Sequence, residues 1–234
     1  MTSTSAEQNA TEPVASEAQD DPEVAAVPAE DEPVADKAAP ARKRPKPGER
    51  RVQILQTLAS MLEQPGAERV TTAALAAKLD VSEAALYRHF ASKAQMFEGL
   101  IEFIEQSVFT LINQIHERET DAFVQARRVL TVLLQFGEKN PGMTRVMVGD
   151  ALVFENDRLL ARMNQFFDKI EAQLRQCLRS GAEAQGSATP TVDANAQASV
   201  LTAFAVGRLQ RYARSGFKRA PTEHLDAALR LLVA

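Results

Sequence analysis

The stretch from residue 71 to 92, TTAALAAKLDVSEAALYRHFAS, constrains the fold of this chain more than any other. Leu75 and Leu79 lie about one helical turn apart among small residues, which predicts a short helix with one buried face. A second short helix is expected after Ser82, because a serine hydroxyl at a helix start accepts a backbone N–H that would otherwise have no partner. The stretch therefore predicts two short helices joined by a tight turn.

Two helices of this length cannot enclose a core alone, and residues 50–63 supply a third. Apolar residues recur there at helical spacing, namely Ile54, Leu55, Leu58, Met61 and Leu62. Three such helices close a small helix-turn-helix domain. In domains of this kind the last helix of the pair lies in the major groove of double-stranded DNA, with its first residues at the base edges.

The motif VSEAALYRHFASKAQMF resembles the recognition helix and the following helix of TetR-family regulators, with Tyr87, Phe90, Lys93 and Phe97 in register. The family usually has glycine in the turn where this chain has Asp80. Aspartate tolerates the left-handed backbone conformation better than most residues, so Asp80 is expected to adopt it. The resemblance implies an all-α fold, with an N-terminal three-helix helix-turn-helix domain and a C-terminal helical domain for dimerisation and partner binding.

Nine residues are expected to contact DNA. Hydroxyls and N–H groups near helix starts contact phosphates, and the first residues of a recognition helix approach the bases. The expected phosphate contacts are Thr71, Thr72, Tyr87, His89 and Lys93. The expected base contacts are Ser82, Glu83, Ala84 and Arg88, with Glu83 accepting from a cytosine amino group and Ala84 touching a thymine methyl. The structural alternatives are a core-edge aromatic for Tyr87, a surface residue for His89 and a helix-start carboxylate for Glu83.

The first 40 residues hold ten acids and one basic residue, Lys37, giving a net charge of −9 against −4 for the whole chain. This acidic tail lacks aromatic residues, so it is expected to be disordered and solubilising. A basic cluster follows at Arg42, Lys43, Arg44 and Lys46. The cluster is either an arm that neutralises phosphates or an ordinary solvated charge run, and the acidic tail could instead compete with DNA for it. The expected divisions are residues 1–47 for tail and arm, 48–91 for DNA binding and 92–234 for the helical domain.

A single short recognition helix reads few base pairs, so a two-fold dimer on a palindromic site is expected. Residues 156–180 and 192–215 are the candidate interface helices, with a loop, GAEAQGSATP, between them. Their candidate interface residues are Leu160, Met163, Phe167, Ile170, Leu174 and Cys177 on the first, and Leu201, Ala203, Phe204, Ala205 and Gly207 on the second. Burial of both helices inside one subunit is the competing interpretation.

A capping box at Ser92 and Gln95 opens a long helix that is expected to end near Arg118. Its apolar stripe comprises Phe97, Leu100, Ile101, Ile104, Val108, Leu111, Ile112 and Ile115. Phe103 lies off this stripe, on the flank shared with Met96, where a polar residue is usual. On the next helix, residues 121–139, Val132 lies opposite the main apolar face. Phe103 and Val132 are therefore either enclosed by neighbouring helices or part of a peptide groove.

Segments including LIEFIE, FGEKNPGMTR and ALVFENDRL resemble the nucleoid occlusion branch of the TetR family. The resemblance extends from about Arg50 to the C-terminus. This resemblance implies a homodimer in the cytoplasm, at the nucleoid, that binds palindromic DNA and the division protein FtsZ together and disrupts FtsZ polymers. It implies that the FtsZ C-terminal tail contacts Phe103, Val132, Gln135, Lys139 and Asn140. Leu111 is a departure from the resemblance, because a close relative has a basic residue there, and one ionic contact with the tail is therefore not expected. The competing function is a ligand-responsive TetR-type transcriptional repressor.

No motif indicates an enzyme, a cofactor or a metal site. His89, His116 and His224 lie far apart, and the chain lacks a phosphate-binding glycine loop and a nucleophile elbow. Asp150, Glu155 and Asp157 flank a helix boundary, where acids commonly cap. The single Cys177 is expected to be a small core residue. Since no apolar run approaches the roughly 18 residues of a membrane span, no membrane partner is expected.

Overall fold

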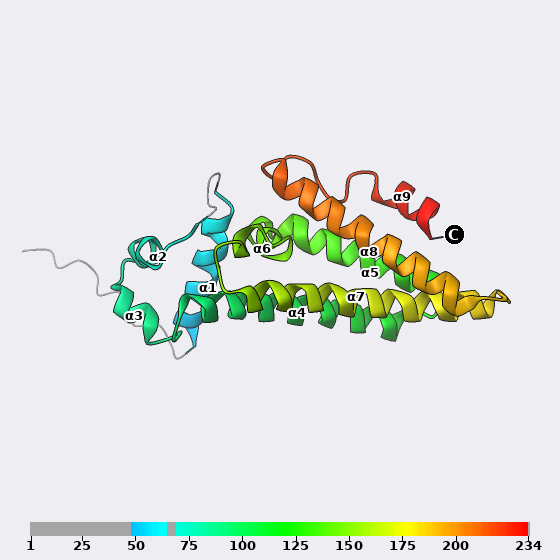
Figure 1. Ribbon diagram of the computed structural model, residues 1–234, viewed down its shortest axis with the longest axis horizontal. Helices are drawn as coiled ribbons and strands as arrows, with labels where there is room; N and C mark the ends of the chain where they lie inside the picture. Colours follow the sequence, from blue (N-terminus) through cyan, green and yellow to red (C-terminus); the bar gives the residue numbers. More distant parts are fainter. Residues whose placement is uncertain (1–47, 65–68, 234) are drawn as a thin grey trace, which may run out of the picture. The chain divides into compact units, whose positions relative to one another are not determined.

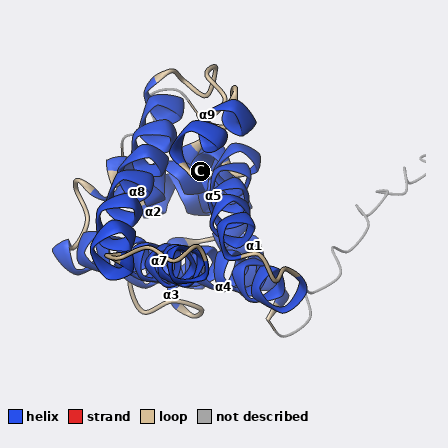
Figure 2. Cartoon of the chain, turned by 90° about the vertical axis from the view of Figure 1, so that its right-hand side faces the viewer, coloured by secondary structure: helices blue, strands red, loops and turns tan. Residues whose placement is uncertain are grey.

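The computed structural model describes residues 48–64 and 69–233, and every regular element in these ranges is helical (Figures 1 and 2). The expected all-α fold is therefore confirmed. The elements are α1 (Glu49–Leu62), α2 (Thr72–Leu79), α3 (Glu83–Tyr87), α4 (Lys93–Arg118), α5 (Ala122–Lys139), α6 (Pro141–Met147), a 3-10 turn η1 (Asp150–Leu152), α7 (Asp157–Ala184), α8 (Pro190–Arg214) and α9 (Leu225–Leu232). The expected disordered tail and basic arm lie outside the described residues.

Both short helices of the helix-turn-helix unit begin with a side-chain cap, and the cap at Ser82 is the predicted one. The Thr71 hydroxyl accepts a hydrogen bond from the Ala74 N–H at 3.1 Å, and the Ser82 hydroxyl accepts one from the Ala85 N–H at 3.3 Å. Asp80 has φ 54° and ψ 52°, the left-handed conformation expected of it. The turn between α2 and α3 is therefore built as the sequence predicted.

Leu86 of α3 is buried with 1% of its surface exposed, whereas Ala84, Tyr87 and Arg88 are exposed. One face of α3 thus packs on α2, and the opposite face remains open. This division is the one that the sequence predicted for a recognition helix.

The long helix α4 runs beside α7 and also packs against α1, α5 and α6 (Figure 1). Two expectations for it were wrong. Leu111 was placed on the buried stripe but is 40% exposed, because it lines a shallow groove between α4 and α5 that is open to solvent. Met96 was placed on an open flank but is fully buried, because the first turns of α4 meet α1 and α6 as well.

Two helices and one loop differ from expectation. Helices α6 and α9 were not predicted, and α6 begins at Pro141 because a proline that ends one helix also fits the first turn of the next. The loop after α7 is shorter than expected, since α7 continues to Ala184. Gly181 lies inside α7 rather than ending it. A Cβ at Gly181 would come within 2.6 Å of the Phe123 ring, so the glycine permits close packing of α7 on α5.

The apolar stripe of α7 mostly faces the core of its own subunit. Met163, Ile170, Leu174 and Cys177 are all buried, so the competing interpretation of this stripe holds for these four residues. Burial also raises the pKa of the Cys177 thiol to about 11, as fits the small core residue predicted there.

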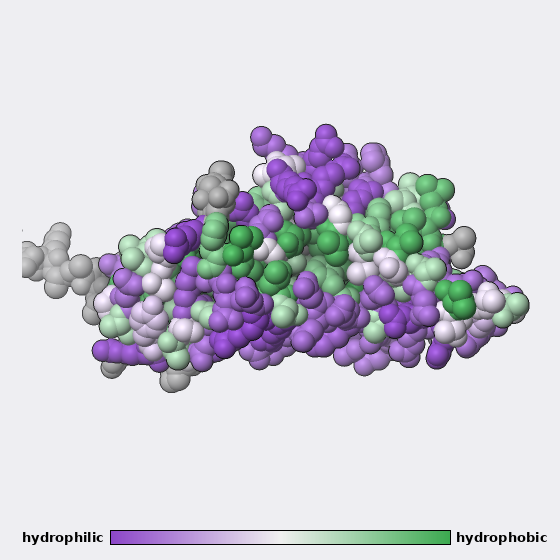
Figure 3. Space-filling view, in the orientation of Figure 1, coloured by the Kyte–Doolittle hydropathy of each residue, from purple (hydrophilic) through white to green (hydrophobic). Residues whose placement is uncertain are grey.

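A second set of apolar residues on α7 and α8 remains exposed. Leu160 is 45% exposed on α7, and Val192 and Val200 are 66% and 55% exposed on α8. Ala203 and Gly207 of α8 are exposed beside a half-buried Phe204, whereas Leu201 and Ala205 are buried. Figure 3 shows apolar side chains gathered on this side of the molecule, in the band between α7 and α8.

Candidate DNA-binding and partner-binding surfaces

The nine predicted DNA-contacting residues come from three adjoining helix starts and from α3. Seven of them are exposed, and Thr72 and Lys93 are half-buried. The exposed ones are Thr71, Ser82, Glu83, Ala84, Tyr87, Arg88 and His89. The structure therefore gathers these residues on the outer side of α2 and α3, with their side chains available to a ligand.

A hydrogen bond joins the starts of α2 and α3. The Thr72 hydroxyl donates to a carboxylate oxygen of Glu83, with 2.6 Å between the two oxygens. This contact fixes the Glu83 carboxylate at the N-terminus of α3, where the helix dipole favours a negative charge. The Thr72 hydroxyl proton is occupied by this bond, so Thr72 would meet a phosphate through its backbone N–H at the first turn of α2.

The two capping hydroxyls keep a donor for DNA. Thr71 and Ser82 each accept a backbone N–H through the side-chain oxygen, and a hydroxyl that accepts one bond still carries a proton to donate. Both residues are exposed. A phosphate oxygen beside either helix start could therefore take this proton without breaking the cap.

Arg51 of α1 supports α3 in a way that the sequence did not reveal. Its guanidinium donates to the His89 carbonyl at 2.9 Å and lies 4.1 Å from the centre of the Phe90 ring. Phe90 is buried, so this stacking holds the end of α3 against α1. The 38 residues between Arg51 and His89 explain why no local pattern indicated the contact.

Lys93, an expected phosphate contact, already has a protein partner. Its ammonium forms a close ion pair with the Glu155 carboxylate, in the segment before α7. The Lys93 and Glu155 side chains are only 24% and 10% exposed. Glu155 was considered only as a surface or capping group, and the ion pair instead links the start of α4 to the start of α7.

The predicted FtsZ-contacting residues lie on α4, on α5 and at the end of α5. Phe103 is 47% exposed, Gln135 and Lys139 are exposed, and Val132 and Asn140 are half-buried. The Asn140 amide donates to the Phe136 carbonyl at 2.8 Å, so this side chain closes the end of α5 rather than standing free. The exposed Phe103 follows the expectation that it lies off the core stripe.

A shallow groove of about 150 Å³ runs between α4 and α5. Its lining includes Leu111 of α4 and Val132 of α5, which therefore lie across from each other. Since α4 and α5 are consecutive antiparallel helices, moving back eight residues on α4 from Leu111 corresponds to moving forward about eight on α5 from Val132. By this register Phe103 lies beside the end of α5, where Lys139 and Asn140 are.

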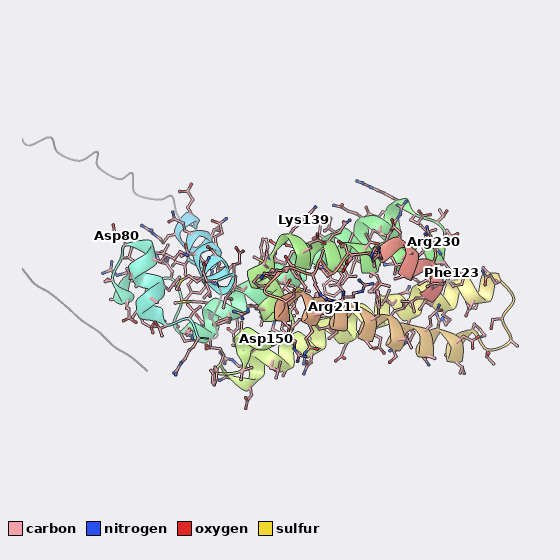
Figure 4. The ribbon with its side chains drawn as sticks, turned by 90° about the horizontal axis from the view of Figure 1, so that it is seen from above. Asp80, Phe123, Lys139, Asp150, Arg211 and Arg230 are labelled. Carbon is pink, nitrogen blue, oxygen red and sulfur yellow. The ribbon has the colours of Figure 1, made fainter. Side chains whose placement is uncertain are left out.

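The DNA-binding and partner-binding residues occupy different parts of the molecule. Figure 4 shows Asp80 beside α2 and α3 and Lys139 on α5, and Figure 1 shows the same separation of these helices. Within the described ranges, no group of three or more His, Cys, Asp or Glu residues is arranged to hold a metal ion. No helix in these ranges has both the length and the apolar content needed to cross a membrane.

Family comparisons agree with this geometry. Residues 54–100 match the family of bacterial regulatory proteins of the tetR type, and residues 120–234 match the tetracyclin repressor-like C-terminal domain in its SlmA-like form. A TetR-family regulator from Thermus thermophilus has the same fold, with a TM-score of 0.64 at 22% identity over 77% of this chain and 97% of that chain. FadR from Bacillus subtilis also has this fold, with a TM-score of 0.63 at 15% identity over 78% of this chain and 97% of the FadR chain. The fold and the helix-turn-helix surface thus define a TetR-type DNA-binding regulator rather than an enzyme.

More similar relatives narrow the class. The chain is 54% identical to the nucleoid occlusion factor SlmA of Photobacterium profundum over 186 residues, which are 79% of this chain and 94% of that protein. It is 53% identical to SlmA of Escherichia coli O81 over 186 residues, which are 79% of this chain and 93% of that protein. The chain therefore belongs to the SlmA family.

Proposed function

We propose that this protein is a nucleoid occlusion factor, which binds chromosomal DNA and FtsZ together and disrupts FtsZ polymers over the nucleoid. The observation that carries the proposal is the exposed face of α4 and α5, with Phe103 and the groove at Val132, in a chain of SlmA type. This function would place the protein at the nucleoid in the cytoplasm.

The DNA-binding part of the proposal assigns α3 to the major groove. Ser82, Glu83, Ala84 and Arg88 would then face the bases, and Thr71, Thr72, Tyr87, His89 and Lys93 would hold phosphates. The exposure of α3 and the unused donors at the starts of α2 and α3 support this assignment. Residues 48–91 would form the DNA-binding domain, and residues 92–234 the domain that dimerises and binds the partner.

The dimer is proposed on the exposed apolar residues of α7 and α8. Leu160, Val200 and the exposed positions Ala203 and Gly207 would meet the same helices of a second subunit, in a four-helix interface. Apart from the adjacent residues and the nearby backbone of α8 itself, no atom of the described residues lies within 4 Å of a Cβ placed on Gly207, so this part of α8 is open to a close-packed neighbour. Two recognition helices related by a two-fold axis would read a palindromic site.

The FtsZ contact is proposed on Phe103, Val132, Gln135, Lys139 and Asn140. Phe103 exposes a large apolar side chain beside Lys139 in the antiparallel register of α4 and α5, as a groove for a short peptide requires. The separation of this face from α3 supports simultaneous binding of DNA and FtsZ.

The test is sedimentation of FtsZ polymer in the presence of GTP. The protein is added alone, then with a palindromic duplex selected by its own binding, then with a scrambled duplex. Loss of polymer that deepens with the selected duplex is expected, because DNA can raise inhibition only by favouring a state that binds FtsZ better. If the amount of polymer is unchanged by the protein in all three samples, the proposal is wrong and a ligand-responsive repressor is favoured. A rise in the thermal midpoint of the protein with an inducer would then identify such a repressor.

A further inference from the structure

The groove between α4 and α5 has an apolar middle and a cationic end. Leu111 and Val132 line the middle, and Arg118 and Arg128 are the charged residues in the lining. Gln114 and Ile115 complete this lining. An extended peptide lying here would meet apolar surface and positive charge side by side.

Helical geometry places both arginines at the same end of the groove. Arg118 follows Leu111 by two turns of α4, which is roughly 10 Å along the axis at 1.5 Å per residue. Arg128 precedes Val132 by one turn of α5, which is roughly 6 Å. Because the two helices are antiparallel, both steps lead toward the loop between α4 and α5, away from Phe103.

The two arginines differ in how they are held. An Arg128 Nη2 lies 3.2 Å from a Glu119 carboxylate oxygen, with the two side chains 55% and 18% exposed. The other Glu119 oxygen accepts the backbone N–H groups of Thr120 and Asp121, so the carboxylate is fixed and orients the guanidinium. A guanidinium has five N–H donors, which leaves Arg128 donors for a second acid.

Arg118 is exposed in the last turn of α4, and within residues 48–64 and 69–233 its guanidinium forms no hydrogen bond or ion pair. Glu117 is also exposed, but it lies one residue away and therefore about 100° around the helix. The cationic end of the groove thus keeps positive charge that is not neutralised within the subunit.

We propose that Arg118 and Arg128 bind an acidic side chain of the peptide that occupies this groove. Leu111 then serves as an apolar contact for the same peptide. The inference rests on the proposed function, since it takes the FtsZ C-terminal tail as the occupant. It places the ionic contact at the end of the groove where α4 meets α5.

The experiment measures binding of a fluorescein-labelled FtsZ tail peptide to the full-length protein by anisotropy, at low and high salt. A second peptide has its carboxylate side chains replaced by amides. The variants are Arg118→Gln, the double variant Arg118→Gln/Arg128→Gln, and the double variant with Leu111→Arg added. Arg219→Gln, an exposed arginine outside the groove, is the matched control for loss of one charge. Helicity and binding of the selected duplex verify that each variant folds.

Each arginine is expected to contribute about two- to fivefold in affinity, as is usual for a solvent-exposed ion pair. The double variant should therefore bind the acidic peptide more weakly and with less dependence on salt, and Leu111→Arg should recover part of the loss. The amide peptide should bind the wild type and the double variant equally. Arg219→Gln should bind like the wild type.

The two hypotheses fail in different ways. If the wild type binds the peptide and the double variant binds it equally well, the inference is wrong and the proposed FtsZ site stands. If the wild type does not bind the peptide at all, the proposed partner is wrong and the inference falls with it.

Discussion

Two anions, the Glu155 carboxylate and a DNA phosphate, would compete for the Lys93 ammonium. In the structure its ammonium pairs with Glu155, and in the proposed complex it meets a DNA phosphate. Binding DNA would then release the Glu155 carboxylate at the start of α7. A single side chain thus connects the DNA-binding surface to a helix of the proposed dimer interface.

Replacing Glu155 with glutamine is expected to strengthen DNA binding by up to about fivefold, because the Lys93 ammonium no longer has a competing carboxylate. Lys93→Gln should weaken binding and reduce the slope of log K against log salt by about one, as for the loss of one phosphate contact. The measurement is duplex binding at several salt concentrations. Glu171→Gln, which frees Arg175 on the outside of α7, is the control and should leave affinity unchanged.

Cys177 predicts an alkaline loss of stability. Its pKa is about 9 in an accessible thiol and about 11 in the folded protein, because burial disfavours the thiolate. The stabilisation is complete below pH 9, where both states are protonated, and is lost as the pH rises from 9 to 11, because only the unfolded thiol ionises there. Two pKa units correspond to about 2.7 kcal/mol.

The measurement is the free energy of unfolding in urea at pH 8 and at pH 11, for the wild type and for Cys177→Ala. The wild type should lose about 2 to 3 kcal/mol more than the variant between these pH values. Burial, with the nearby Glu138 and Glu63 carboxylates, also raises the pKa of Tyr212, but Tyr212 is present in both proteins and cancels. Identical losses would show that Cys177 ionises as easily in the folded state.

At the scale of elements, the contact of α6 with α1 depends on one glycine. A Cβ at Gly142 would lie 2.0 Å from the backbone carbonyl oxygen of Ala59, which cannot turn aside as a side chain can. Gly99 of α4 also faces α1, but a Cβ there would meet the end of the Leu55 side chain at 3.1 Å and the Phe90 ring at an ordinary contact distance of 3.5 Å. The two glycines therefore offer a matched pair.

Gly142→Ala is expected to destabilise the fold by about 1 to 3 kcal/mol, because α6 and α1 must move apart. Gly99→Ala should cost less, since the Leu55 side chain can adjust and alanine favours a helix. Thermal unfolding of the two variants and the wild type provides the comparison. A Gly142→Ala protein as stable as the Gly99→Ala protein would contradict the close contact between Gly142 and the Ala59 carbonyl.

At the scale of the whole molecule, the proposed dimer depends on the open face of α8. Val200→Glu puts a charge among exposed apolar residues and is expected to shift the protein toward monomer. A monomer presents one recognition helix, so affinity for a palindromic duplex should fall by at least tenfold. Light scattering gives the mass and duplex titration the affinity.

Leu231→Glu is the control for this variant. Leu231 lies on α9 and is 86% exposed, so a glutamate there should leave both mass and affinity unchanged. If Val200→Glu remains dimeric while it binds DNA normally, the interface lies elsewhere on the molecule.

Local chemistry explains which features the sequence predicted well. The caps at Thr71, Ser82 and Ser92 and the left-handed Asp80 depend on residues within a few positions of each other, so short patterns reveal them. Longer helices in which apolar residues recur at helical spacing, such as α1 and α5, were also predicted. The short helices α6 and α9 were missed, because seven or eight residues give too little periodicity and their stability comes from neighbours.

Contacts between distant segments were the part that local patterns could not predict. Arg51 with His89 and Lys93 with Glu155 join residues 38 and 62 positions apart. The register of α4 and α5 also decided that Leu111 borders a groove rather than filling the core. A helical period gives the direction of each side chain but not the neighbour that it meets.

By itself the sequence determined an all-α fold, a helix-turn-helix with its caps, the exposed face of α3, and the resemblance to its family. These properties follow from hydrogen bonds and apolar spacing within single helices and turns. Only the tertiary structure decided which apolar residues of α7 and α8 stay exposed, which partner holds Lys93, and where positive charge meets the α4/α5 groove. Those depend on how separate helices pack, because each packing contact is made with a residue that is remote in the sequence.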